Sequence, residues 1–222
     1  MDIHAIIFGA TGHIGQGLLI ECLGNPDVKS VLTIGRRPAG KQDAKLKEIS
    51  HNDFTNFDAL AEEMTGYNAC FFCLGVSSAG MSEEKYHLIT HDYAVSAAKV
   101  LSHQNPQMTF CFISGSGADE TLQSRLMWAR VKGKAENSLK ALPFKAVYIF
   151  RPAYIQPVKG VKTTYKMYKV FGFFYPLWKV LFPNYVITTE ILARAMIRAV
   201  EGKAPKQTLE NKDIKALGSD SL

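Results

Sequence analysis

A glycine-rich turn near the start of the chain constrains its fold more than any other feature. Residues 9–15 read Gly-Ala-Thr-Gly-His-Ile-Gly and follow the apolar run Ile3–Phe8. Apolar residues at helical spacing continue from Ile14 to Leu23, and Gly24-Asn25-Pro26 ends that pattern. A strand, a tight glycine turn and a helix in this order bring free backbone N–H groups and a helix dipole to a pyrophosphate. We therefore predict a dinucleotide-binding loop with contacts from Gly9, Thr11, Gly12, His13, Ile14 and Gly15.

Strand and helix patterns alternate along most of the remaining chain. We predict further strands over 31–35, 49–54, 69–75, 109–114 and 146–150, and further helices over 83–102, 122–142 and 188–200. This alternation is typical of a doubly wound parallel sheet. With 222 residues, 47% of them hydrophobic, the chain can bury one substantial core. The prediction is a single α/β Rossmann domain over 1–222 that binds NAD(P), with a small C-terminal substrate lobe.

The segment 152–186 breaks the alternation and is both aromatic and basic. No acidic residue lies between Glu136 and Glu190, whereas eight basic residues do: Lys140, Lys145, Arg151, Lys159, Lys162, Lys166, Lys169 and Lys179. A solvated cationic face, an anionic substrate, an anionic membrane surface and non-specific nucleic-acid binding all fit this charge. We expect 152–186 to be a substrate or lid segment for a small molecule that can be anionic, and we expect no specific nucleic acid.

The apolar stretch 170–182 is too short, and too broken by Pro176 and Lys179, to span a bilayer. It could cover a substrate pocket or make a weak contact with a membrane surface. The first residues show no export signal, so we expect a cytoplasmic protein.

The four cysteines, Cys22, Cys70, Cys73 and Cys111, fall on apolar positions, which favours reduced, buried thiols. Cys70 and Cys73 form a CxxC inside a predicted strand, and no second pair accompanies them, so we interpret the motif as structural. His87 and His91 lie four residues apart on a predicted helix without an evident third ligand. We interpret them as an exposed helix face and predict no metal site.

The end of the second predicted strand indicates which dinucleotide fits. An NAD site places a carboxylate there for the adenosine ribose, whereas an NADP site has cations for the 2′-phosphate. This chain has Gly35-Arg36-Arg37, and the planar guanidinium suits a phosphate. We predict NADP(H), bound through Arg36 and Arg37.

Together these motifs resemble those of an atypical short-chain dehydrogenase/reductase, and more closely the family of the HIV-Tat-interacting oxidoreductase. Further similarity lies in Ser114-Gly115-Ser116-Gly117-Ala118-Asp119, in Arg151-Pro152 and in the tail 209–214. The resemblance implies that Leu74 and Gly75 lie against the cofactor and that Asp53 and Phe54 lie near the adenine, although ordinary loop capping explains Asp53-Phe54 equally well. Ile155, after the Arg-Pro pair, is a further expected cofactor contact.

The superfamily's chemistry uses a tyrosine four residues before a lysine. The spacing to Arg-Pro makes Lys132 that lysine, and Trp128 stands at the tyrosine position. An indole N–H can donate a hydrogen bond but has no proton to give near neutral pH. Ser114 or Ser116 could orient a carbonyl, Lys132 could hold the ribose, and Tyr154, Tyr86 or a water could supply the proton.

Three functions remain open from the sequence, and the third, an interfacial or nucleic-acid-binding role for the basic lobe between Glu136 and Glu190, rests on charge alone. The first is an NADP(H)-dependent oxidoreductase for a small carbonyl or hydroxyl compound, with an unconventional acid/base group. The second is a non-catalytic NADPH sensor or protein-interaction module.

Overall fold

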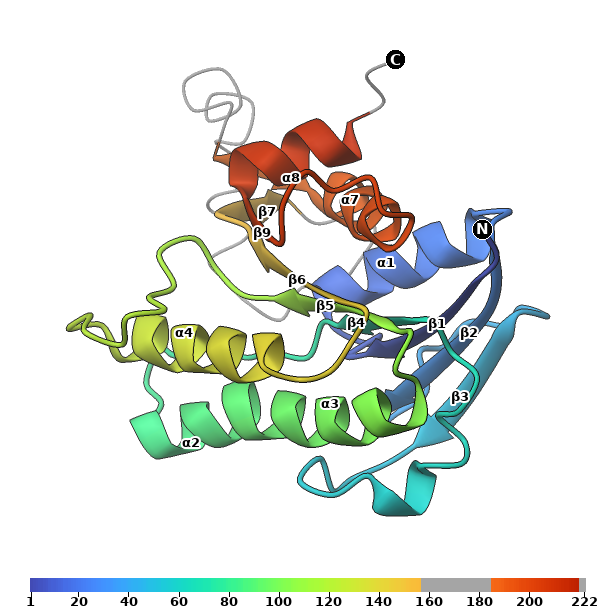
Figure 1. The fold of residues 1–222 in the computed structure, drawn as a ribbon, viewed down its shortest axis with the longest axis horizontal. Coiled ribbons are helices and arrows are strands. Elements are labelled where there is room, and N and C mark those ends of the chain that lie inside the picture. The colour runs from blue at the N-terminus through green and yellow to red at the C-terminus, as the bar shows by residue number, and fades with distance from the viewer. Residues whose placement is uncertain (157–184, 220–222) are drawn as a thin grey trace.

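The computed structural model describes residues 1–156 and 185–219, and these form three layers, with helices on both faces of a parallel sheet (Figure 1). Seven strands of the described residues make up the main sheet, in the order β3-β2-β1-β4-β5-β6-β9. The strands are β1 (Ile3–Phe8), β2 (Val28–Gly35), β3 (Leu46–Ser50), β4 (Ala69–Phe72), β5 (Thr109–Ile113), β6 (Ala146–Arg151) and β9 (Thr208–Glu210). This order confirms the predicted doubly wound Rossmann fold, because the chain reverses direction across the sheet after β3.

Helices from different parts of the chain cover the two faces. Figure 1 shows α1 (His13–Gly24), α7 (Thr189–Val200) and α8 (Asn211–Gly218) on one face. The other face carries α2 (Glu83–His87), α3 (Tyr93–Gln104) and α4 (Met127–Lys140). A 3-10 turn, η1 (Asp58–Leu60), follows β3, and β7 (Tyr154–Gln156) pairs with β8 (Val186–Thr188) in a separate two-stranded sheet.

Alternation along the strands produces two hydrophobic cores. In β1, Ile3, Ala5 and Ile7 face the core under α1 and α7, whereas Ile6 and Phe8 face the core under α3 and α4. Every residue of β4 and β5 is buried. Strands covered on both faces are apolar at every position, which explains the continuous apolar runs in the sequence.

The third strand lies earlier than the predicted range 49–54. Strand β3 ends at Ser50, and Asp53 then caps a turn by accepting from the backbone N–H of Thr55 at 2.9 Å. The Phe54 side chain is buried against Phe57 and Tyr93, with ring centroids 5.8 and 5.5 Å away. The apolar character that suggested a strand belongs to a loop residue of the core.

Two predicted helices also differ from the structure. The range 122–142 begins with a loop, since the Asp119 carboxylate accepts from the N–H groups of Thr121, Gln123 and Ser124 and holds the chain away from α4. The range 83–102 contains a π-helical turn, Leu88–Asp92, between α2 and α3.

The short elements at the end of the chain were not predicted. β9 has only three residues, and the capping of α8 depends on a short local contact, in which the Asp213 carboxylate accepts from the Glu210 N–H at 2.9 Å. Strands of three residues are too short for periodicity to reveal. The apolar stretch 170–182 and Lys159, Lys162, Lys166, Lys169 and Lys179 lie outside the described residues.

A buried ion pair joins α4 to β6. Glu136 is fully buried, and its carboxylate accepts from the Arg151 guanidinium and from the Ser114 hydroxyl. Arg151 also contacts Glu120 at 2.7 Å and Glu210 at 3.2 Å, so it joins α4, β6 and β9. The hydrogen bonds and charge of these carboxylates raise the pKa of Arg151, although burial acts in the opposite sense.

We expect Glu136→Ala to lower the free energy of unfolding by about 3 kcal/mol, because the largely buried Arg151 guanidinium loses its buried carboxylate partner. Urea denaturation followed by circular dichroism measures the change. As a control, Glu83→Ala removes an exposed ion pair with Arg130 and should cost less than about 1 kcal/mol. Equal losses for the two variants would contradict the structural role of the Glu136 pair.

Candidate functional site

The glycine turn holds three backbone segments too close together for side chains. Gly9 has φ of +79°, and an added Cβ would lie 2.7 Å from the backbone nitrogen of Leu74. A Cβ on Gly15 would lie 2.2 Å from the Gly9 carbonyl oxygen. Glycine is therefore required where β1 approaches the end of β4 and where α1 packs on the turn. Gly12 differs, because its φ of −77° suits any residue and its nearest contact would be 3.2 Å.

The N-terminus of α1 can accept an anion. Gly12 is the N-cap and offers no side-chain acceptor, and the first turn of α1 contains no acidic residue. The first N–H groups of a helix lack partners within the helix, and the helix dipole favours negative charge beside them. Thr11, which is exposed, and Gly12 lie at this end of the helix. The glycine turn 9–15 and this helix end, together called the cofactor cradle, therefore fit the pyrophosphate of a dinucleotide.

His13 connects the turn to β7. Its ring forms a hydrogen bond with the backbone of Ile155, and burial lowers its pKa although that hydrogen bond acts in the opposite sense. Ile155 is itself buried, and Ile14 of α1 packs against the same hydrophobic core as Ile155. Two sequence-predicted cofactor contacts, His13 and Ile155, are thus in direct contact.

The two arginines follow β2 at the same edge of the sheet. Arg36 and Arg37 are exposed, and among the described residues neither has a carboxylate partner. Glu48 of β3 lies beneath this loop, where it accepts from the Ala39 N–H at 2.7 Å and from the Thr33 hydroxyl at 3.1 Å. Sequence reasoning missed Glu48, which the parallel pairing of Thr33 with Glu48 brings to the site.

The remaining predicted cofactor contacts also follow strand ends. Asp53 is exposed, and hydrogen bonds from Thr55 lower the pKa of its carboxyl group, so the structure gives it a loop-capping position. Phe54 is only 4% exposed and belongs to the core. Leu74 is partly buried beside Gly9, whereas Gly75 is exposed with open space around it.

Lys132 lies against the end of β5. Its ammonium donates to the Ile113 carbonyl at 2.8 Å and lies 4.9 Å from the centre of the Phe112 ring. Burial lowers its pKa to about 8, although the charge of Glu136 one turn along α4 acts in the opposite sense. A lysine with this pKa exchanges a proton near neutral pH.

The serine and the tryptophan do not form an acid/base pair. The Ser114 hydroxyl donates to the buried Glu136, so it contributes to the ion-pair network. Trp128 packs over the loop after β5, where a Cβ on Gly117 would lie 3.3 Å from its Cη2 atom. Ser116 is exposed on that loop.

Neither tyrosine proposed as a substitute acid is free in the structure. Tyr86 is 3% exposed, and burial raises the pKa of its phenol. The Tyr154 hydroxyl donates to Gln156 Oε1 at 2.9 Å within β7.

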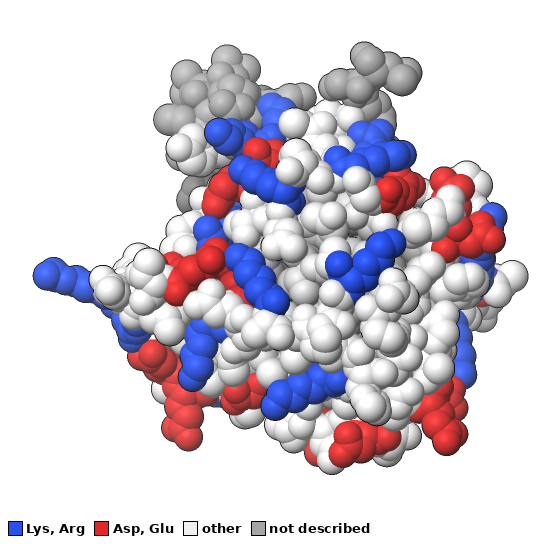
Figure 2. All heavy atoms as spheres, in the orientation of Figure 1, with Lys and Arg blue, Asp and Glu red and all other residues white. Residues whose placement is uncertain are grey.

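Between Glu136 and Glu190, the positive charge of the basic residues that the structure describes is partly neutralised. Lys140 pairs with Glu120 at 3.0 Å, and Arg151 pairs with three carboxylates, whereas Lys145 is exposed. Figure 2 shows basic and acidic side chains mixed over the face in view. Among residues 1–156 and 185–219, none of the helices combines the length and apolar character needed to cross a membrane.

The four cysteines are free thiols, and three of them, Cys22, Cys70 and Cys111, are fully buried. Burial raises the pKa of Cys70 and raises that of Cys73 to about 12. The structural interpretation of the CxxC therefore agrees with the structure.

The chain is similar to known proteins in both sequence and fold. HTATIP2 of Rattus norvegicus is 28% identical over 97% of this chain and 89% of that protein. The mitochondrial protein FMP52 of Chaetomium globosum is 29% identical over 96% of this chain and 96% of that protein. The solved structure of MoeE5 in complex with UDP-glucose and NAD superposes with a TM-score of 0.69 at 14% identity, covering 93% of this chain and 75% of that chain. No family model matches the chain.

The sheet order, the glycine turn and this superposition together define a doubly wound Rossmann fold. In sequence, the chain is similar to the HTATIP2 and FMP52 proteins over nearly its full length. This result confirms the family resemblance predicted from the motifs.

Gly12→Ala and Gly15→Ala should differ sharply in stability. The Cβ at position 15 would meet backbone at 2.2 Å, and forced overpacking costs about 1–3 kcal/mol, or a fall in Tm of about 3–10 °C. Gly12→Ala should melt within about 2 °C of the wild type, since its φ is ordinary. Differential scanning calorimetry decides this, and equal Tm values for both variants would mean that the turn is built differently.

Proposed function

We propose that the chain is an NADP(H)-dependent oxidoreductase that acts on a small carbonyl or hydroxyl compound. The observation that carries the proposal is the uncapped N-terminus of α1, held in a glycine turn, beside two exposed arginines at the end of the neighbouring strand β2. The carboxyl ends of β1, β2 and β4 lie at this edge, where doubly wound folds bind nucleotides.

Each group at this edge matches one part of the dinucleotide. The N–H groups of His13, Ile14 and Gly15 would hold the pyrophosphate, and the open face of Gly12 lets it approach. Arg36 and Arg37 would hold the 2′-phosphate, on a loop that Glu48 fixes through the Ala39 N–H. Leu74, Gly75 and Ile155 would border the nucleotide, and Asp53, in the loop after β3, would lie near the adenine. When bound, NADPH would supply a hydride.

Lys132 is the group that we propose for the proton. Its pKa of about 8 lies near the working pH, and its ammonium lies at the end of β5. The ammonium can hold a ribose hydroxyl and release a proton toward a substrate oxygen, directly or through a water molecule. Without a phenol at position 128 this transfer is slow, so we expect a low turnover number. We also propose 152–186 as the substrate segment, on its aromatic and basic sequence alone.

A second candidate function is an NADPH-binding sensor without turnover. The Ser114 hydroxyl is committed to Glu136, and the Trp128 ring packs on the loop 115–117, so one usual catalytic group is engaged elsewhere and the usual tyrosine is replaced. The location of the protein is also a proposal: the sequence favours the cytoplasm, whereas FMP52 relatives are named mitochondrial.

The wild-type protein should bind NADPH more tightly than NADH. Charge-assisted hydrogen bonds are worth about 1.5–3 kcal/mol each, so losing one from each arginine in Arg36→Ala plus Arg37→Ala should weaken NADPH binding by about 10²- to 10⁴-fold and leave NADH binding unchanged. Isothermal titration calorimetry measures both affinities. The charge-matched control is Lys29→Ala plus Lys99→Ala. Both lysines are exposed, Lys29 at the opposite end of β2 and Lys99 on α3. An unchanged NADPH/NADH ratio in the arginine variant would refute the phosphate assignment.

The rate of NADPH-dependent reduction of a quinone or aldehyde should fall as pH rises through about 8. A general acid works in its protonated form, and Lys132 loses its proton in that range.

Trp128→Tyr should restore a phenol and raise the rate about 10²–10⁴-fold, whereas Trp128→Phe should not.

The double variant Trp128→Tyr plus Lys132→Ala should lose most of that gain while still folding. Rapid turnover by the wild type with no gain in Trp128→Tyr would show that another residue supplies the proton. Normal NADPH binding with no turnover in any of these variants would favour the sensor function.

A further inference from the structure

A cluster of two histidines and one aspartate lies on the α3–α4 side of the sheet, away from the glycine turn. The sequence suggested that His87 and His91 occupy an exposed helix face. Their side chains are instead 26% and 13% exposed, because this helix layer packs against α4.

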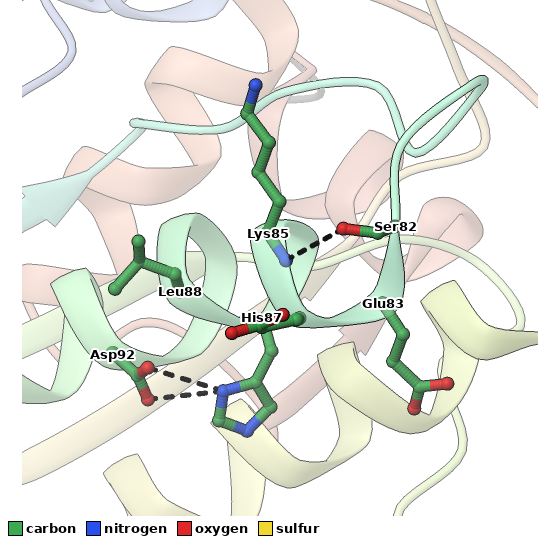
Figure 3. Close-up of a pocket in the computed structure, with 7 residues that line it drawn as sticks. Ser82, Glu83, Lys85, His87, Leu88 and Asp92 are labelled. Carbon is green, nitrogen blue, oxygen red and sulfur yellow. Dashed lines mark hydrogen bonds and ion pairs between the residues drawn. The ribbon is translucent and has the colours of Figure 1, made fainter.

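The π-helical turn Leu88–Asp92 creates the cluster. A π turn inserts an extra residue into the helix and changes the direction of the side chains that follow. Asp92 is thereby brought beside both rings: one carboxylate oxygen lies 2.6 Å from His91 Nδ1 and 3.3 Å from His87 Nδ1. Figure 3 shows the His87 ring directed at the Asp92 carboxylate. One donor atom from each residue lies within 4.8 Å of the other two.

The surroundings of the rings also favour a ligand. His91 Nε2 lies 3.0 Å from the Ser138 hydroxyl of α4, which orients the ring from behind. Metal-binding histidines usually have such a partner on their second nitrogen. His87 Nε2 is buried, and among the described residues it has no hydrogen-bond partner, so no second protein contact fixes that ring's tautomer.

We propose that His87, His91 and Asp92 bind a divalent transition-metal ion of the zinc class. Two imidazoles and one carboxylate suit zinc, cobalt or nickel better than magnesium or calcium, which prefer oxygen ligands. Zinc–ligand distances of about 2.0–2.2 Å place tetrahedral donors about 3.3 Å apart. The His87–Asp92 separation already has this value, whereas the His91–Asp92 contact of 2.6 Å would have to open as the ion enters.

The site has an entrance and a place for a fourth ligand. A pocket of about 570 Å³ opens beside the cluster and is lined by Ser82, Glu83, Glu84, Lys85, His87, Leu88 and Asp92. A water molecule can complete the tetrahedron from this side, as in zinc sites with three protein ligands. The positive charge of Lys134 also acts on His91. The buried cysteines do not compete for the ion in the folded protein, because burial raises their pKa values.

A bound ion would join α2, through His87, to the π turn that precedes α3, through His91 and Asp92. A ligand that binds the folded state alone stabilises it in proportion to its concentration and affinity, so added ZnCl₂ should raise Tm. This site is separate from the cofactor cradle, and its occupancy should leave NADPH affinity unchanged.

The test uses the full chain with no affinity tag, because a histidine tag would itself bind the metal. Calorimetric titration with ZnCl₂ should give one ion per chain, and CoCl₂ should give visible absorption bands typical of tetrahedral cobalt. His91→Ala plus Asp92→Asn should weaken binding at least tenfold and abolish the zinc-dependent rise in Tm. His103→Ala, which removes an exposed histidine of the following helix α3, should change neither.

A milder variant keeps the test valid if the double variant does not fold. Ser138→Ala leaves all three ligands in place and should weaken zinc binding about tenfold through the orientation of His91. Zinc affinity equal in the wild type, in the double variant and in Ser138→Ala would overturn the proposal, as would stoichiometric binding lost only in His103→Ala.

Discussion

The close approach of the glycine turn to its neighbours is the constraint on which the rest of the site depends. An extra carbon on Gly15 would lie 2.2 Å from the Gly9 oxygen, and one on Gly9 would lie 2.7 Å from the Leu74 nitrogen. Because no side chain separates these segments, α1 begins directly above the ends of β1 and β4. Its first N–H groups therefore point to the edge at which β2 delivers Arg36 and Arg37.

A second constraint explains why the reacting end of the site departs from the usual arrangement. The buried Glu136 must be compensated, and it is held by Arg151 and by the Ser114 hydroxyl. This network joins α4 to β6 and positions Lys132 one turn away, but it also engages the serine. With Trp128 packed on the glycine loop after β5, Lys132 is left as the titratable group whose pKa burial has moved towards neutrality.

The sequence could predict the features that depend on local pattern. The glycine turn, the buried strands β4 and β5 and the arginine pair follow from residues close together in the chain. Features that depend on distant pairing could not be predicted. Glu48 reaches the arginine loop only because β3 pairs with β2, and Phe54 looks like a strand residue until its contacts with Phe57 and Tyr93 are known. The π turn that adds Asp92 to the two histidines has no signal in the hydrophobic periodicity, which continues through it.

The central claim is that the N-terminus of α1 holds the pyrophosphate of NADP(H) and the loop after β2 holds its 2′-phosphate. Backbone amide chemical shifts during titration of ¹⁵N-labelled protein with NADP⁺ test it most directly, since each amide reports its own contact. The account predicts that the largest changes occur at His13, Ile14, Gly15, Arg36 and Arg37, and that NAD⁺ reproduces those at the turn but not those at the arginines. Changes confined to other residues, or identical changes at Arg36 and Arg37 with both nucleotides, would contradict it.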